Sequence, residues 1–410
     1  MLKAIMLGAG MRGTFAYGNY AIEHPGEIKF VGVAEHNEER RRNFQRIHGI
    51  DDANCFSDFH DIIKREKFAD CAFVCLMDRD HYEPAVALMK LGYDVICEKP
   101  MSSSIEEIRE MEKVSKETGR VLSVCHVLRY SAFFEKLKEL IDSNVIGKVW
   151  NIQHREGVGY YHHAHSFVRG NWRNLKESSP MILQKSCHDV DILSFLLGRR
   201  CVRVSSFGSL SYFKKENAPE GAPLRCTDGC PHSEECPYYA PRLYNGDACG
   251  FATAVTLDKT PEGLMKALRE GPYGRCVFHC DNDAVDHQVV NLEYEDGVSA
   301  SFTMCAFSRK IEREMTIMGT LGEIKCNMEA SIITVDDFAS GNHETIQLNN
   351  KHEGHGGSDE RMMKDVVKLL QSKDHARSRS DISISVESHV VALLAEQSRL
   401  DNGKVMEVSL

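Results

Sequence analysis

A glycine-rich turn near the amino terminus constrains the fold of this chain more than any other feature. It reads Gly8-Ala9-Gly10-Met11-Arg12-Gly13, directly after the apolar run Ala4 to Leu7 and directly before a stretch expected to be helical. In such a turn the first glycine bends the chain, the second lets the backbone approach a pyrophosphate, and the third packs helix against strand. The amino end of the helix then offers N–H groups to phosphate. The turn therefore predicts a dinucleotide site that includes Gly8, Gly10, Met11, Arg12 and Gly13.

Short apolar runs alternate with amphipathic stretches up to about residue 128. This alternation is typical of βαβ units around a parallel sheet that is buried on both faces. The runs are Ala4 to Leu7, Phe30 to Ala34, Cys71 to Leu76, Val95 to Cys97 and Val121 to Val124. Ser104 and Glu107 have the spacing of a capping box at the start of a helix. We therefore expect residues 1–128 to form a doubly wound α/β domain.

The pattern changes after residue 128. Val289 to Tyr294 and Val298 to Met304 flank Asp296-Gly297 and predict an antiparallel hairpin, with further β-type runs behind it. Two late amphipathic stretches, 359–370 and 388–400, are expected to cover the resulting sheet. We therefore expect residues 129–410 to form an α+β domain with a mostly antiparallel sheet, interrupted by a Cys-rich insertion at about 214–273.

Composition excludes several classes of protein. The chain has 410 residues, with 50 Lys and Arg against 60 Asp and Glu, a net charge of −10 that disfavours binding to nucleic acid or to an anionic membrane. Its 15 cysteines, odd in number and scattered, argue against a secreted disulfide framework. No apolar run is long enough to span a bilayer. We expect a soluble protein of the reducing cytoplasm.

The acidic residue Glu35 follows the second apolar run, where a carboxylate can bind both ribose hydroxyls of a dinucleotide. A carboxylate there repels the extra phosphate of NADP and so predicts NAD. The cations nearby, His36 and Arg40 to Arg42, leave NADP open as the alternative, and Arg40 is a candidate cofactor contact.

The tripeptide Glu98-Lys99-Pro100 directly follows the run Val95 to Cys97, and His81 precedes it by 17 residues. With the glycine-rich turn, it makes the chain resemble the glucose-fructose oxidoreductase and inositol dehydrogenase family, Gfo/Idh/MocA. The resemblance spans nearly the whole chain, and it includes Arg129, Ile146-Gly147-Lys148, His188 with Asp191, and 319–323.

The resemblance implies a Rossmann domain followed by an open-faced sheet domain, with a nicotinamide between them and His81, Glu98 and Lys99 near the cofactor. Most members transfer a hydride between the nicotinamide and a sugar or cyclitol carbon. Others oxidise a sugar transiently to assist glycosidic bond cleavage, and one branch reduces biliverdin.

Lys99 and His188 are the candidate catalytic residues. Lys99 follows a parallel strand, at the edge where open α/β sheets bind ligands, and its ammonium can hydrogen-bond a reacting hydroxyl. His188 is suited to accept the proton when an alcohol becomes a ketone. Asp191 lies on the same helical face, where it can orient the imidazole or bind substrate.

Gln184 departs from the family pattern, because sugar and cyclitol dehydrogenases usually carry an Asp four residues before the histidine. An amide cannot take a proton, although it can still bind a substrate hydroxyl. Lys185 is a candidate second cation beside it. The departure keeps a redox-recycling hydrolase or lyase open as an alternative, and a non-catalytic dinucleotide sensor as another.

Aromatic and histidine-rich loops predict substrate binding. Rings can stack on a sugar face while polar groups meet its hydroxyls. The candidates are Tyr160, His163, His165, Trp172 and Arg173. The three histidines at 162, 163 and 165 also leave a metal role open.

The insertion carries Cys226, Cys230 and Cys236 within 11 residues. Four thiolates satisfy a structural zinc, and Cys276 is our preferred fourth ligand over Cys249 and Cys280. An iron-sulfur cluster and unliganded thiols are the alternatives.

We also expect the open sheet of the second domain to present a large apolar face. Such a face would bury against another subunit in a homodimer or homotetramer.

Overall fold

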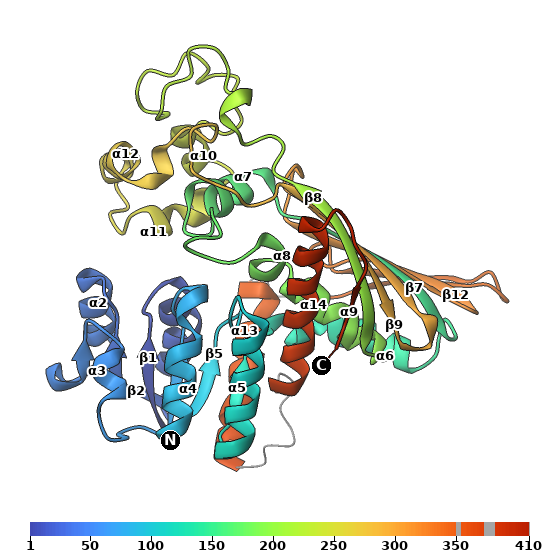
Figure 1. Cartoon of the computed structure of the whole chain (residues 1–410), viewed down its shortest axis with the longest axis horizontal. Helices are drawn as coiled ribbons and strands as arrows, with labels where there is room; N and C mark the ends of the chain where they lie inside the picture. Colours follow the sequence, from blue (N-terminus) through green and yellow to red (C-terminus); the bar gives the residue numbers. More distant parts are fainter. Residues whose placement is uncertain (350–353, 373–381, 410) are drawn as a thin grey trace.

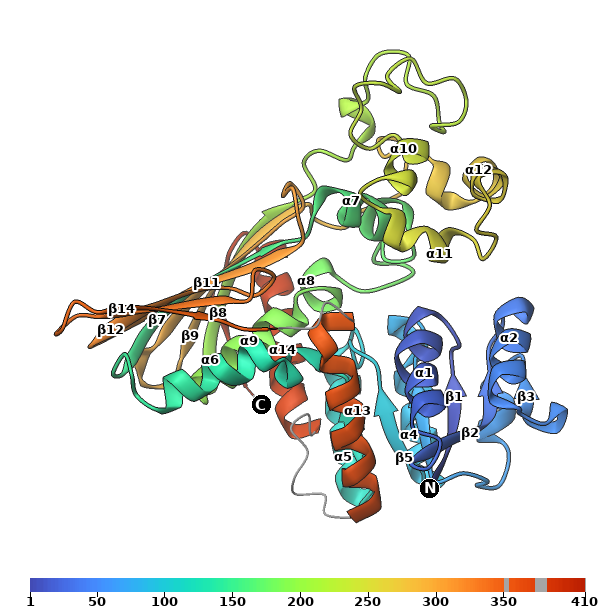
Figure 2. The ribbon, with the colours of Figure 1, turned by 180° about the vertical axis from the view of Figure 1, so that it is seen from behind.

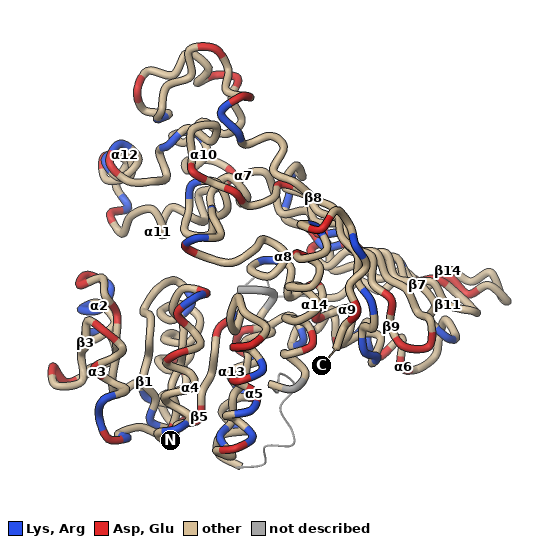
Figure 3. The backbone as a smooth tube through the Cα atoms, in the orientation of Figure 1, with Lys and Arg blue, Asp and Glu red and all other residues tan. Residues whose placement is uncertain are grey.

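The computed structural model describes residues 1–349, 354–372 and 382–409. Two sheets form the centres of two domains, and an insertion projects from the second domain above the first (Figure 1). Among the described residues, no helix is both long and apolar enough to cross a membrane. Basic and acidic residues are interspersed over both domains rather than gathered by sign (Figure 3).

The first sheet has six parallel strands in the order β3-β2-β1-β4-β5-β6. Its strands are β1 (Leu2–Leu7), β2 (Ile28–Ala34), β3 (Cys55–Phe56), β4 (Cys71–Val74), β5 (Asp94–Cys97) and β6 (Leu122–Val124). The apolar runs are buried on both faces, as the predicted doubly wound sheet requires. This order brings the ends of β1, β4 and β5 side by side.

Helices cover both faces of this sheet. One face packs against η1 (Arg12–Gly18), α1 (Asn19–Glu23), α2 (Glu38–His48) and α13 (Gly354–Ser372). The other packs against α3 (His60–Ile63), α4 (Tyr82–Lys90), α5 (Ile105–Thr118) and the start of α14 (Ile382–Leu400). Helix α5 begins where the sequence predicts, with the side chain of Ser104 accepting the N–H of Glu107 at 3.4 Å.

Helix α13 differs from the expectation that it covers the second sheet. It buries Met362, Met363 and Val366 against the first sheet instead. In Figure 2 it lies far from the open end of the second sheet. A segment from the far end of the chain therefore completes the core of the first domain.

The second sheet has nine strands in the order β14-β13-β12-β11-β7-β10-β9-β8-β15. The pairing of β7 with β10 is parallel and the other pairings are antiparallel. The strands are β7 (Val149–Gly157), β8 (Cys201–Ser209), β9 (His287–Tyr294), β10 (Ser299–Cys305), β11 (Glu312–Gly319), β12 (Gly322–Asn327), β13 (Ile332–Asp337), β14 (His343–Gln347) and β15 (Met406–Glu407). The predicted hairpin is present as β9 and β10.

Helices α6 (Ala132–Asp142), α9 (Cys187–Leu197) and α14 cover one face of this sheet, and the other face is open (Figure 2). The expectation of a large apolar open face is wrong. Arg155 pairs with Glu312 and Glu314 across neighbouring strands of this face, and scattered apolar side chains such as Trp150 and Phe207 are exposed among the polar ones. The buried apolar residues of the strands point to the helices.

The insertion leaves the sheet after β8 and returns at β9. It contains α10 (Ala240–Asn245), α11 (Ala252–Val255) and α12 (Pro261–Glu270). Its own apolar cluster includes Phe213, Tyr238, Tyr244 and Leu268. The cluster also takes in residues of α7 (Tyr160–His163) and η5 (Ala164–Arg169), which follow β7.

Candidate active site

The glycine-rich turn has the shape that a bound pyrophosphate needs. Gly8 has φ +90°, and a Cβ there would lie 2.3 Å from the carbonyl oxygen of Cys75. A Cβ on Gly13 would lie 2.2 Å from the carbonyl oxygen of Gly8. A Cβ on Gly10, in contrast, would meet no atom of the described residues within 4 Å. The outer glycines are therefore packed and the middle one faces open space, so the turn fits the phosphates of a dinucleotide.

The guanidinium of Arg12 binds carboxylates of the protein itself. Its Nε donates to Glu98 at 2.6 Å, and its two terminal nitrogens donate to Asp359 on α13 at 3.0 and 2.8 Å. Burial alone would raise the pKa of the Glu98 carboxyl, but Arg12 and the Tyr17 hydroxyl hold it below its ordinary value. The expected cofactor contacts Arg12 and Glu98 thus form an ion pair that braces the turn.

Glu35 lies at the carboxyl end of β2, where its carboxylate accepts the N–H of Ala9 and of Asn37, each at 2.9 Å. The side chain is buried beside the glycine-rich turn. Arg41 donates to the carbonyl oxygen of Glu35 at 2.6 Å, while Arg40 is exposed on the first turn of α2. A carboxylate fixed at this point suits the ribose of a dinucleotide.

Lys99 follows β5 and reaches across the boundary between the domains. Its ammonium donates to the backbone carbonyl oxygen of Gln184, the last residue of α8 (Met181–Gln184). The peptide bond between Lys99 and Pro100 is cis. Because it contacts Gln184, the ammonium points toward the segment that carries His188.

His81 is buried, and both of its ring nitrogens lie within hydrogen-bond distance of backbone carbonyl oxygens. Its Nδ1 lies 2.7 Å from the carbonyl oxygen of Pro100, and its Nε2 lies 3.1 Å from that of Leu76. The imidazole joins the end of β4 to the backbone that follows Lys99. Its expected role near the cofactor stays a prediction.

His188 lies in the first turn of α9, close to a second histidine. Its ring is nearly perpendicular to that of His126, with 6.0 Å between the centroids. Burial lowers the pKa of His126, which follows β6, to about 4. Arg129 holds Asp191 through two hydrogen bonds of 2.6 and 2.7 Å. The carboxylate of Asp191 is thus committed to Arg129 and is not exposed to a ligand.

A buried network of charges fixes the segment between α8 and α9 to the second sheet. Arg313 on β11 donates to Asp189 at 2.8 Å and to Glu156 on β7 at 2.6 Å. Lys185 lies 2.9 Å from the same Glu156 oxygen, and the His154 ring lies 2.7 Å from Asp189. Although burial alone would raise it, Arg313 and His154 hold the pKa of Asp189 well below its ordinary value. Lys185, expected to meet substrate, therefore belongs to this network.

The histidine-rich loop packs into the base of the insertion. His163 is fully buried between the rings of Phe167 and Phe213, at 5.5 and 5.4 Å. His165 is buried as well and lies 2.8 Å from the hydroxyl of Tyr244. These two histidines fill the core of the insertion rather than line a substrate site.

Tyr160 also binds within the protein, where its hydroxyl donates to Asp247 of the insertion. The structure does not support a metal site at His162, His163 and His165, since the described part of the chain holds no cluster of three or more metal-binding side chains.

Trp172 and Arg173 make contacts at the edges of the second domain. The indole N–H of Trp172 donates to Asp78, in the loop after β4, at 3.1 Å. Ser179 also donates to Asp78, at 2.5 Å, so this carboxylate ties the two domains together. Arg173 pairs with Glu177 and with Asp281.

The expected zinc site is not formed. Cys226, Cys230, Cys236 and Cys276 line one small cavity of about 20 Å³, so the sequence placed them together correctly. Within the described ranges, however, no three His, Cys, Asp or Glu side chains approach as metal ligands, and all 15 cysteines are free thiols. The buried guanidinium of Arg169 contacts the Cys226 sulfur at 3.6 Å instead.

A larger cavity of about 380 Å³ lies at the opposite end of the first sheet, bordered by Asp70, Asp94 and Arg120. Open parallel sheets bind ligands at the carboxyl ends of their strands, whereas this cavity lies at the amino ends. We assign it no part in the site.

Sequence reasoning missed His126 and the network of Arg313, Asp189 and Glu156. The position of His126 could have been predicted from the sequence, because it follows β6 at the same sheet edge as Lys99. The network could not have been predicted, since its residues come from separate elements without a characteristic spacing.

A dinucleotide turn in one domain and a lysine that reaches a histidine-bearing segment of a second, open-sheet domain define a two-domain oxidoreductase. The chain belongs to the Gfo/Idh/MocA family. The model "Oxidoreductase family, NAD-binding Rossmann fold" matches residues 2–126, and "Oxidoreductase family, C-terminal alpha/beta domain" matches residues 138–379.

Relatives agree with this assignment. YteT of Bacillus subtilis (strain 168), named as an oxidoreductase, is 30% identical over 350 residues, which cover 81% of this chain and 78% of YteT. The scyllo-inositol 2-dehydrogenase (NAD(+)) of the same organism is 25% identical, over 67% of this chain and 70% of its own. A solved levoglucosan dehydrogenase, in complex with NADH and levoglucosan, has the same fold, with a TM-score of 0.74 and 17% identity over the whole of both chains.

Proposed function

We propose that this protein is an NAD-dependent dehydrogenase that transfers a hydride between the nicotinamide and a hydroxyl-bearing carbon of a sugar, sugar acid, cyclitol or glycoside. The observation that carries the proposal is the position of Lys99. Its ammonium follows β5, in the same sheet as the dinucleotide turn after β1, and is held by the carbonyl oxygen of Gln184 four residues before His188. The relatives named for scyllo-inositol and levoglucosan support a polyhydroxy substrate.

The chain's own residues handle the hydroxyl proton. The Lys99 ammonium hydrogen-bonds the reacting hydroxyl, and the carbonyl of Gln184 keeps the ammonium oriented. His188 accepts the proton as the alcohol becomes a ketone and returns it in the reverse direction. The nicotinamide, when bound, accepts or returns the hydride. The buried Glu35 favours NAD over NADP.

The test is to incubate pure protein with NAD and a panel of polyols, sugar acids and glycosides and to follow NADH absorbance. Lys99→Met is expected to lower kcat/KM by a factor of about 10² to 10⁴ while NADH still binds. Reduction of NAD by no polyhydroxy compound, or full activity of Lys99→Met, would contradict the proposal.

A second candidate is a hydrolase or lyase that retains NAD and recycles it. Gln184 favours this candidate, because it stands where the sugar and cyclitol dehydrogenases of the family usually carry an Asp, and an amide cannot take a proton. Cleavage of a nitrophenyl glycoside by protein that retains its cofactor, without accumulation of NADH, would favour this candidate over the first.

We also propose that the protein forms a homodimer or homotetramer in the cytoplasm. The open face of the second sheet is the contact we propose between copies, with Trp150, Phe207 and Val289 exposed on it. Sedimentation as a monomer at micromolar concentration would exclude this contact.

A further inference from the structure

The insertion reaches from the second domain to the dinucleotide turn of the first. The hydroxyl of Thr253, on α11, lies 3.8 Å from the sulfur of Met11 within the turn, and 242 residues separate the two in sequence. In Figure 1, α11 lies above the helices that begin at the carboxyl ends of β1 and β2. Met11 neighbours Gly10, the glycine with open space in front of it.

Aromatic rings hold this part of the insertion in place. His165 stacks on Phe251, with centroids 4.7 Å apart and 18° between the planes, and on Tyr273, at 4.7 Å and 9°. Phe251 directly precedes α11 and also stacks on His162 at 5.0 Å. Both Phe251 and Tyr273 are half-buried, so each keeps part of its ring free for a further contact.

Tyr273 stacks on the same histidine as Phe251, the residue that directly precedes α11. Burial raises the pKa of its hydroxyl, while the positive charges of Arg40 and Arg173 oppose that rise. Arg40 belongs to the first turn of α2, in the first domain.

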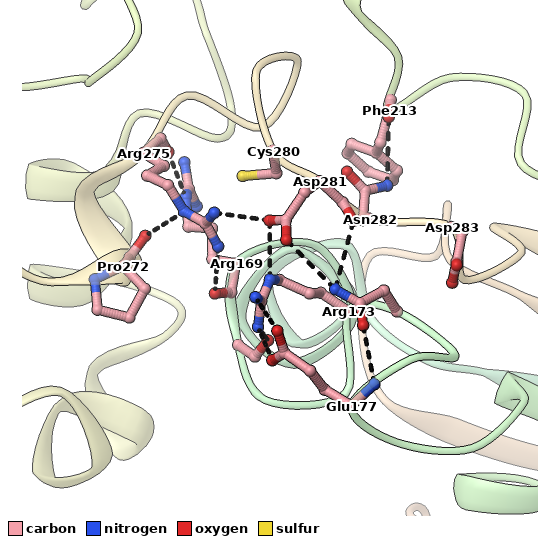
Figure 4. A network of polar contacts seen from close by, with 12 residues as sticks. Arg169, Arg173, Glu177, Phe213, Pro272, Arg275, Cys280, Asp281, Asn282 and Asp283 are labelled. Carbon is pink, nitrogen blue, oxygen red and sulfur yellow. Dashed lines mark hydrogen bonds and ion pairs between the residues drawn. The ribbon is translucent and has the colours of Figure 1, made fainter.

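Ion pairs brace the base of the insertion (Figure 4). Asp281 accepts from Arg275 at 2.7 Å and from Arg173 at 2.8 Å. Arg275 also exchanges hydrogen bonds with Arg169, whose Nε donates to the carbonyl oxygen of Arg275 at 2.7 Å. The insertion is thus tied to the second domain at its base and touches the first domain at α11.

We propose that the insertion is a second wall of the dinucleotide site, in which Phe251, Thr253 and Tyr273 contact the adenosine diphosphate half of the cofactor and slow its release. The inference rests on the proposed function, because it takes the ligand of the turn to be a nicotinamide dinucleotide. Half-buried aromatic rings are suited to stack on a base, and a hydroxyl is suited to a phosphate or ribose oxygen. Under the proposed function, the nicotinamide half would lie toward Lys99, which follows β5, whereas Thr253 contacts Met11 in the turn after β1.

The experiment compares ligands that carry one half of the dinucleotide each. ADP-ribose and nicotinamide mononucleotide are titrated by calorimetry into the full-length protein, and NADH release is followed by stopped-flow fluorescence. We expect Phe251→Ala and Tyr273→Ala to weaken ADP-ribose about tenfold and to speed NADH release, with nicotinamide mononucleotide unchanged. Leu224→Ala is the matched control, since Leu224 is an exposed side chain of the same insertion.

Two milder variants guard against loss of folding. Thr253→Val replaces the hydroxyl with a methyl group and should still speed NADH release. Tyr273→Phe keeps the ring and should retain ADP-ribose affinity. Unchanged ADP-ribose affinity and NADH release in Phe251→Ala, Thr253→Val and Tyr273→Ala would overturn this inference and leave the proposed function standing. Failure of the unmodified protein to bind NADH or ADP-ribose would overturn the proposed function as well.

Discussion

The guanidinium of Arg313 donates to the carboxylate of Asp189 at 2.8 Å, and Asp189 is the residue that follows His188. The same guanidinium donates to Glu156 at 2.6 Å, so one side chain of β11 holds both β7 and the first turn of α9. All three side chains are buried. The position of the candidate proton acceptor therefore depends on buried side chains of two strands of the second sheet, Glu156 on β7 and Arg313 on β11.

Arg313→Met should destabilise the protein strongly, because it leaves two carboxylates buried with less positive charge. Breaking a buried pair by removing one partner costs about 3–5 kcal/mol. Arg313→Lys keeps the charge but not the forked geometry and should cost less. Urea unfolding followed by tryptophan fluorescence measures the free energy of unfolding.

The matched control is Arg155→Met, which removes the arginine that pairs with Glu312 and Glu314 on the open face of the same sheet. Because that pair is solvent-exposed, its loss should cost no more than about 1 kcal/mol. An equal decrease in the free energy of unfolding of Arg313→Met and Arg155→Met would contradict a larger stabilising contribution from the buried Arg313 network.

The sequence was informative where a function or fold depends on neighbours in the chain. The glycine-rich turn, Glu35 and Lys99 each follow an apolar run, and the parallel sheet brings these run ends to one edge. The helix start at Ser104 was predictable for the same local reason. In such places spacing alone carries the structural information.

The sequence was uninformative where contacts join distant segments. Arg12 pairs with Asp359, 347 residues away, and nothing in the spacing of either residue marks it as half of an ion pair. The placement of α13 on the first sheet was missed because an amphipathic helix does not specify which sheet it covers. His163 has the composition of a binding loop, and only its tertiary packing reveals that it is buried.

Gln184 should matter for substrate affinity more than for turnover. Its backbone carbonyl holds Lys99, and this contact survives when the side chain is changed. Gln184→Ala should therefore raise KM about three- to tenfold, the loss of one hydrogen bond, and leave kcat nearly unchanged. Steady-state kinetics with an active polyol will measure both constants. A fall in kcat as large as that of Lys99→Met would instead assign the Gln184 side chain a part in the chemistry.

Glu35 should decide between the two dinucleotides. Glu35→Ala removes an acceptor of the ribose hydroxyls and the repulsion of a ribose phosphate, so NADH binding should weaken by about 1.5–3 kcal/mol relative to NADPH. Titrations monitored by protein fluorescence give both dissociation constants. Glu38→Ala, at an exposed position three residues on, is the control and should leave the ratio unchanged. An unchanged ratio in Glu35→Ala as well would remove the basis for NAD specificity.

His163 should make stability depend on pH. Burial lowers the pKa of its imidazole from 6.5 to about 4, and neither ring nitrogen has a hydrogen-bond partner among the described residues. Between these two values the unfolded chain takes up a proton that the folded chain does not bind, so the free energy of unfolding falls as the pH falls from 6.5 to 4. His163→Phe keeps the ring stacking and removes the titration. Urea unfolding at a series of pH values should show a slope shallower by at most about 1.4 kcal/mol per pH unit in this window. Identical slopes for the unmodified protein and His163→Phe would contradict this role of His163.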